Sequence, residues 1–69
     1  MKVKAQDGLV VNTKEVEIKG NLIKCIPSFN IKGTLELGRY KTFERALEVF
    51  SELSCFLWNG ASEYIMPKE

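Results

Sequence analysis

The stretch LGRYKTFERALEVFSEL, residues 37–53, ends one sequence pattern and begins another. Apolar and polar residues alternate before it, whereas after Thr42 the apolar residues recur at the spacing of an amphipathic helix. Thr42 is a favourable N-cap, and the acidic residue two positions later lies where the helix dipole stabilises a negative charge. The pattern predicts a helix over about 42–58, ended by the pair Asn59-Gly60.

Turn signals upstream of this helix divide the chain into short runs that favour β-strands. Asp7-Gly8 predicts a hairpin with a type I′ turn, and Gly20-Asn21 predicts the next turn. The run EVEIK at 15–19 alternates apolar and charged residues, as expected of a strand with one buried face. The run LIKCI at 22–26 is apolar on both faces, which predicts a strand that is central or covered on both sides and that ends at Pro27.

A second alternating segment runs from residue 29 to residue 38. Its apolar members share one face: Phe29, Ile31, Leu35 and Leu37. Gly33, in the same row, marks either a β-bulge or the end of a hairpin loop, and both interpretations stay open. The run EYIMP at 63–67 is long enough for a short strand that returns to the sheet edge. The sequence therefore predicts a single α+β domain, residues 1–69, in which one α-helix packs across one face of a mainly antiparallel sheet of about four to six short strands.

Composition excludes several classes of protein. The chain has 69 residues, a net charge of +1, no histidine and two cysteines, Cys25 and Cys55. Two distant cysteines make neither a disulfide scaffold nor a structural zinc site, and without histidine the commonest general base and transition-metal ligand are missing. We therefore expect no enzyme activity, no cofactor and no metal site. The first residues lack the apolar run of a secretion signal, and no run approaches the length of a membrane span, so we expect a cytoplasmic protein with reduced thiols.

The predicted helix is apolar over a wider arc than one sheet face covers. On a wheel of 100° per residue, the stripe that should face the sheet contains Phe43, Ala46, Phe50, Leu53 and Leu57. Val49 and Phe56 extend this stripe on one flank, and Leu47 and Trp58 extend it on the other. The apolar arc is then about 200° wide, against the ~100° typical of a helix that lies on a core.

Two explanations of this arc remain open. Either other segments of the chain cover both flanks, or one flank is an interface with a second copy or with another protein. Trp58 favours the interface because tryptophan is enriched at binding hot spots. A chain of 69 residues is also marginally stable alone, and a partner would add stability. We therefore predict a surface for a partner or for self-association that contains Leu47, Val49, Phe56 and Trp58.

Charged residues opposite the apolar arc form a row at helical spacing: Glu44, Glu48 and Glu52. This row is either a solvated face or an acidic ridge that binds a basic partner. Nucleic-acid binding is not expected, because the aromatic residues fall on the core face or in the helix and do not line a basic sheet face.

Arg39, Tyr40 and Lys41 lie just before the N-terminus of the predicted helix. Backbone N–H groups at such a terminus, together with two cations, favour a phosphate or a carboxylate ligand. The simpler interpretation is that Tyr40 caps the core while the two cations solvate the turn. Under the first interpretation, all three are candidate ligand-binding residues for an anionic small molecule.

Three stretches of the chain carry a resemblance to a known family: MKVKAQDG at 1–8, LGRYKTFERALEVFSEL at 37–53 and YIMP at 64–67. They resemble the pattern M-K-x-x-x-Q-D-G, then L-G-x-Y-x-T-x-x-R-A-x-E-V, then Y-x-M-P, of a family of short uncharacterised proteins of Gram-positive bacteria and their phages. At the position of Arg39 that family often has an acidic residue, and the helix end SCFLWNGAS is more apolar than is usual in it. The resemblance implies no catalytic residues. It implies a phage or prophage setting, in which small proteins commonly bind host proteins or sequester ligands.

Together, these patterns predict a small non-catalytic binding protein that acts by protein–protein contact. The expected forms are a homodimer, an inhibitor of a host defence or regulatory protein, or both. The alternative is an oligomeric sponge for an anionic, nucleotide-like small molecule held near Arg39, Tyr40 and Lys41. The sequence leaves the partner's identity and the oligomeric state open.

Overall fold

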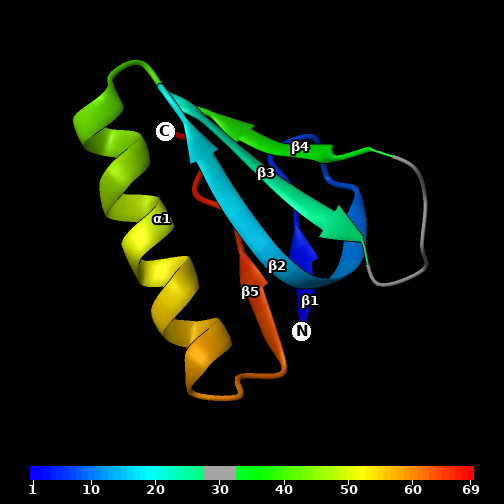
Figure 1. Cartoon of the computed structure of the whole chain (residues 1–69). Coiled ribbons are helices and arrows are strands. Elements are labelled where there is room, and N and C mark those ends of the chain that lie inside the picture. Colours follow the sequence, from blue (N-terminus) through cyan, green and yellow to red (C-terminus); the bar gives the residue numbers. More distant parts are fainter. Residues whose placement is uncertain (28–32) are drawn as a thin grey trace.

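The computed structural model describes residues 1–27 and 33–69, which form five strands and one helix (Figure 1). The elements in chain order are β1 (Lys2–Lys4), β2 (Val10–Lys19), β3 (Leu22–Pro27), β4 (Leu35–Arg39), α1 (Phe43–Trp58) and β5 (Glu63–Ile65). The strands form one sheet in the order β4-β3-β2-β1-β5, and every neighbouring pair is antiparallel except β1 and β5. The predicted α+β class is confirmed. The predicted core positions of Phe29 and Ile31 lie outside the described residues.

The longest strand, β2, connects the two halves of the sheet. Its first residues pair with β1, and the remainder pairs with β3. A β-bulge between Thr13 and Glu15 separates the two halves, and the strand bends strongly along its length (Figure 1). The buried hydroxyl of Thr13 donates to the carbonyl oxygens of Glu15 (2.8 Å) and Ile26 (3.1 Å), so this polar group is satisfied inside the core.

Both predicted hairpins form, but one uses a different turn. Gly20-Asn21 is the predicted two-residue loop between β2 and β3. Between β1 and β2, the N–H of Ala5 donates to the carbonyl of Leu9 (2.8 Å), which leaves three residues in the loop. Gly8 donates to the carbonyl of Ala5 (2.9 Å) and has a φ of +93°, as in three-residue hairpin loops that place glycine in the left-handed region. A type I′ turn at Asp7-Gly8 would require Gln6 to pair with Leu9. Ala5 pairs with Leu9 instead, so the predicted type I′ turn is wrong.

Strand β4 is short and irregular. Its pairing with β3 shifts register so that Leu37 bulges out of the ladder. The carbonyl of Leu37 accepts a hydrogen bond from the N–H of Gln6 (2.9 Å), which ties the bulge to the β1–β2 loop. Gly33, with a φ of +99°, lies before the first residue of β4. It therefore marks the end of the loop that leads into β4, and the β-bulge lies at Leu37.

Helix α1 lies across β2 and β3 and forms the second layer of the domain (Figure 1). The largest fully buried side chains come from both layers: Val3, Thr13, Ile23, Cys25, Leu37, Val49 and Leu53. The helix begins as predicted, with Thr42 Oγ1 accepting from the N–H of Arg45 (3.1 Å). At its other end, the N–H groups of Gly60 and Ala61 donate to carbonyls of the last turn, with Gly60 at a φ of +74°.

Strand β5 returns the chain to the sheet edge, as the run at 63–67 predicted. Its parallel pairing with β1 is extended on both sides by bonds from Lys2 N–H to Ser62 (3.0 Å) and from Met66 N–H to Lys4 (2.9 Å). The residues after β5 then continue to the N-terminal end of α1. This path places the end of the chain beside one flank of the helix only.

Candidate functional site

The two flanks of α1 differ in what covers them. One flank, here called the closed flank, lies against β5 and the last residues of the chain and comprises Arg45, Glu52 and Phe56. The opposite flank, here called the open flank, comprises Phe43, Leu47 and Trp58, of which 49%, 42% and 90% are exposed. The open flank is the larger apolar surface that the helix presents to solvent.

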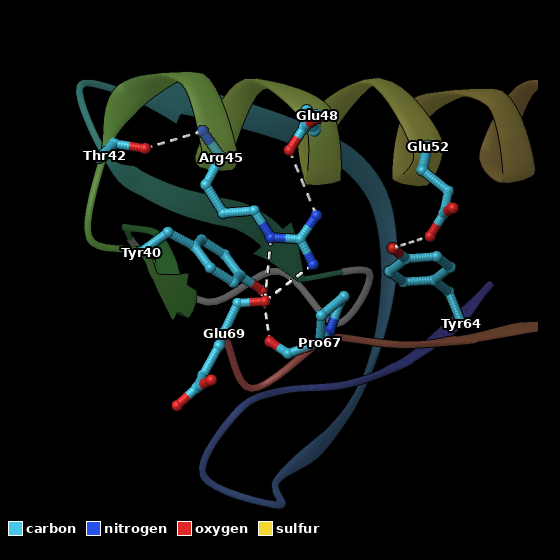
Figure 2. A network of polar contacts seen from close by, with 8 residues as sticks. All are labelled: Tyr40, Thr42, Arg45, Glu48, Glu52, Tyr64, Pro67 and Glu69. Carbon is cyan, nitrogen blue, oxygen red and sulfur yellow. Dashed lines mark hydrogen bonds and ion pairs between the residues drawn. The ribbon is translucent and has the colours of Figure 1, made fainter.

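Tyr64 of β5 organises the closed flank. Its hydroxyl donates to Glu52 Oε1 (2.5 Å), and its ring meets that of Phe56 edge-on, with 5.0 Å between the ring centroids (Figure 2). Burial raises the pKa of the Tyr64 hydroxyl, and the hydrogen bond and negative charge of Glu52 raise it further. Tyr64 is therefore a neutral donor at ordinary pH, and Glu52 has a structural partner.

One of the four residues predicted for an interface is wrong. Val49 is 2% exposed and belongs to the core. Leu47 and Trp58 lie together on the open flank and are exposed, and their part in an interface stays a prediction. Phe56 is 40% exposed but lies on the closed flank against Tyr64.

The helix is rolled toward β5 relative to the predicted orientation. Its buried residues are Ala46, Val49 and Leu53, whereas Phe43, predicted to face the sheet, is half exposed. The physical reason is that β5 and the chain end cover the Val49 side of the helix. The apolar arc is wide enough to bury one side and leave the other in contact with solvent.

Residues along the open side of α1 follow alternating steps of four and three positions. The row begins with Phe43 and Leu47 and continues with the partly buried Phe50, Ser54 and Leu57. Such steps are the spacing of a seam between two packed helices. Ser54 is the one small residue in this row, and it leaves room for a side chain from a facing helix.

Gln6 holds the C-terminal residues from the β1–β2 loop. Its Nε2 donates to the carbonyl oxygens of Pro67 and Lys68 (both 3.1 Å), and its Oε1 accepts from the N–H of Arg39 (2.7 Å). Three segments that are distant in the sequence therefore meet at one amide group. A Cβ atom at Gly38 would lie 3.0 Å from Gln6 Cδ, so a side chain there would push this amide aside.

Tyr40 has the structural role that the simpler interpretation gave it. It is buried, its hydroxyl donates to the carbonyl of Pro67 (2.7 Å), and its backbone N–H donates to Asn21 (2.9 Å). Burial raises the pKa of the Tyr40 hydroxyl, and the positive charge of Arg45 partly opposes this. Because the ring is buried, it caps the core and is not a stacking surface for a ligand.

An open cavity of about 470 Å³ lies between the start of α1 and the end of the chain, and it is lined by Arg39, Tyr40, Lys41, Arg45, Lys68 and Glu69. The structure thus brings together the three predicted ligand-binding residues and adds Arg45 and Lys68. Arg45 is fixed in the cavity wall, because its Nε and Nη2 donate to the main-chain oxygen of Glu69 (2.9 and 2.8 Å; Figure 2). A third bond, from Nη1 to Glu48 (3.4 Å), holds the same guanidinium from the helix.

The described residues contain no group of three or more side chains placed to share a metal ion. Cys25 is buried and Cys55 is exposed, and both are free. Burial raises the pKa of the Cys25 thiol. Within residues 1–27 and 33–69, no helix has the length and apolar character of a membrane span.

Comparison of the chain with protein-family models, with curated proteins and with solved structures gives no match.

Proposed function

We propose that this protein is a non-catalytic binding protein that acts by protein–protein contact, with the open flank of α1 as its contact surface. The first occupant we propose is a second copy of the chain. The observation that carries this proposal is Trp58, which is 90% exposed on the open flank together with the partly exposed Phe43 and Leu47. A tryptophan, a phenylalanine and a leucine exposed together on one side of a single helix favour a partner over solvent.

The amount of apolar surface supports a weak pair. At their exposed fractions, Phe43, Leu47 and Trp58 present on the order of 400 Å². Two copies would then remove on the order of 800 Å² from water, below the ~1,200 Å² at which stable complexes begin. The expected pair is therefore reversible, with a dissociation constant in the micromolar range.

The spacing of the row supports the packing of two helices, and the small Ser54 favours an antiparallel arrangement. When the two-fold axis is perpendicular to the helices, the same surface meets itself with the helices antiparallel, so a residue near one end of α1 contacts a residue near the other end. Phe43 of one copy would then face Trp58 of the other, and Leu47 would face Ser54. The small side chain of Ser54 fits this pairing, because it leaves space for the leucine.

A different protein would use the same residues. This is the form that the resemblance to phage-associated proteins favours, with a host defence or regulatory protein as the partner. A second copy is proposed first because the row is self-complementary, with a small residue placed opposite a large one.

Light scattering after size-exclusion chromatography tests this proposal. The mass of the wild-type protein should rise from 7.9 kDa toward twice that value as its concentration increases through the micromolar range. Leu47→Asp and Trp58→Ser should each weaken pairing about 30-fold or more, because loss of a hot spot costs about 2 kcal/mol. Cys55→Ser, an exposed change on another side of α1, should leave pairing unchanged. A 7.9 kDa mass at every concentration would exclude self-association.

A further inference from the structure

The cavity beside Tyr40 carries a charge that pairing through α1 does not use. Four of its lining side chains are cationic, Arg39, Lys41, Arg45 and Lys68, and one carries a carboxylate, Glu69. The whole chain has a net charge of only +1. Four of the ten lysines and arginines of the chain therefore line this one cavity.

Most of these cations are available to a ligand. Among the described residues, no carboxylate lies within 4.0 Å of the ammonium group of Lys41 or Lys68. Arg39 makes one exposed ion pair, at 3.6 Å from Glu36. Exposed pairs of this kind are weak and exchange readily for a more highly charged partner.

Arg45 already holds an oxygen atom in the cavity wall. Two of its N–H groups converge on the main-chain oxygen of Glu69, while the side-chain carboxylate of Glu69 points away from the guanidinium (Figure 2). The planar fork of arginine binds phosphate oxygens in the same way. The oxygen of Glu69 therefore marks a position that a ligand oxygen can share or take.

We propose that this cavity binds a small molecule that carries two or more phosphate groups. Its volume of about 470 Å³ lies within the range of small-molecule sites. Lys41 and Lys68 have no carboxylate partner among the described residues, whereas Arg39 and Arg45 each pair with an exposed glutamate. A diphosphate or triphosphate has enough charged oxygens to bind both lysines and to replace these weak pairs, which a single carboxylate or phosphate has not. The four cations line one cavity, so a compact free anion can reach all of them.

This site is independent of the proposed pairing. Arg45 belongs to the closed flank, and Trp58 belongs to the open flank on the other side of the same helix. Anion binding and self-association can therefore be disproved separately, because each is tested by substitutions of different residues.

Isothermal titration calorimetry with sodium pyrophosphate tests the site. We expect saturable binding to the wild-type protein, weakened about 5- to 10-fold by Lys41→Ala and by Lys68→Ala, since each removes one charged hydrogen-bond donor. Lys2→Ala removes the same charge from the far end of β1 and should change the affinity less than about twofold. Both cavity lysines are exposed, so their variants should unfold at the wild-type temperature.

Several results would overturn the proposal. No saturable heat with millimolar pyrophosphate would exclude the site. An equal loss of affinity in Lys2→Ala would show a general effect of the protein's charge. Equal heat with sodium sulfate at the same ionic strength would show the same. Binding of a single-stranded oligonucleotide more tightly than pyrophosphate, weakened by both Lys41→Ala and Lys68→Ala, would assign the cavity to nucleic acid.

Discussion

The closed flank and the open flank belong to the same helix and both carry large apolar side chains, but only the closed flank has a partner among the described residues of the chain. On the closed flank, Phe56 packs on Tyr64, and Arg45 binds the main chain at Glu69. On the open flank, Leu47 and Trp58 meet solvent. Because β5 and the residues after it occupy a single side of α1, the domain has no further segment among its described residues to cover the other side.

The difference shows how a short chain divides its apolar surface. A 69-residue domain has too few elements to surround a helix that is apolar over about 200°. One sheet and one return strand cover the core side and the Val49 side. The exposed apolar side chains of the open flank, Phe43, Leu47 and Trp58, remain uncovered by the described residues of the chain.

The largest expected effect comes from breaking the closed flank. Tyr64→Ala removes a buried ring and its contact with Phe56, and such truncations cost about 3–5 kcal/mol. This is comparable to the whole stability of a domain of this size, so the variant should be largely unfolded at 25 °C by circular dichroism. The matched change on the open flank, Trp58→Ala, should alter the stability of dilute monomer by less than about 0.5 kcal/mol. Equal losses from the two changes would contradict the distinction between the flanks.

A smaller effect is expected from the amide that holds the chain end. Gln6→Ala loses the bonds to Pro67, Lys68 and Arg39, and should lower the free energy of unfolding by about 1–2 kcal/mol in urea titrations. Gln6→Glu keeps an oxygen that accepts from the Arg39 N–H. It replaces the NH2 group that donates to Pro67 and Lys68 with an oxygen that cannot donate. Hydrogen exchange should therefore show the Arg39 amide protected in Gln6→Glu and unprotected in Gln6→Ala. The same exchange rate in both variants would mean that the amide does not join these segments.

Above pH 10, Tyr64 of the closed flank should lower the stability of the domain as the pH rises. Below the ordinary tyrosine pKa of 10.0, Tyr64 is neutral in both the folded and the unfolded chain and adds no pH dependence. Above pH 10 the unfolded chain loses this proton while the folded chain retains it, so the free energy of unfolding falls as the pH rises, by up to about 1.4 kcal/mol per pH unit. Tyr64→Phe should make this slope shallower between pH 10 and pH 11, measured by urea titration. An unchanged slope in Tyr64→Phe would assign the alkaline loss to other groups.

The smallest expected effect concerns the exposed ion pair of the closed flank. Arg45 and Glu48 are 3.4 Å apart, with 41% and 70% of their side chains exposed. Glu48→Gln should therefore change the free energy of unfolding by less than about 0.5 kcal/mol, and the melting temperature should change little. A larger loss would indicate that charge pairing, and not the packing of Tyr64, closes this side of the helix.

Local signals made most of the fold predictable. Thr42 and the Asn59-Gly60 pair defined the helix ends, and Gly20-Asn21 defined a hairpin, because each signal acts within a few residues. The turn type at Asp7-Gly8 was wrong because it depends on which pair closes the hairpin, and the dipeptide alone does not fix that.

The candidate sites were less predictable because they depend on contacts between distant segments. The sequence indicated the wide apolar arc, but the roll of the helix is set by β5, so Val49 was assigned to the wrong surface. Arg39 and Lys41 were identified from their position, whereas Lys68 reaches the same cavity only through the path of the chain end. No local pattern indicated the role of Gln6.

Three stretches of the chain, residues 1–8, 37–53 and 64–67, meet around the Gln6 amide. Gln6 comes from the first stretch, Gly38 and Tyr40 from the second, and Pro67 from the third, and all are in contact. Their arrangement gives these positions a structural reason: they hold the chain end against the sheet. The residues proposed for pairing lie on the other flank of α1.

Fluorescence of Trp58 during dilution tests the central claim most directly, because Trp58 is the one tryptophan in the chain and lies on the open flank. If a second copy covers this flank, the emission of a concentrated sample should be blue-shifted and should move to the red on dilution. The midpoint of this shift should fall at the concentration where the mass from light scattering lies midway between monomer and dimer. Leu47→Asp should show red-shifted emission at all concentrations. Emission typical of a solvent-exposed tryptophan in the wild-type protein at every concentration would contradict the claim.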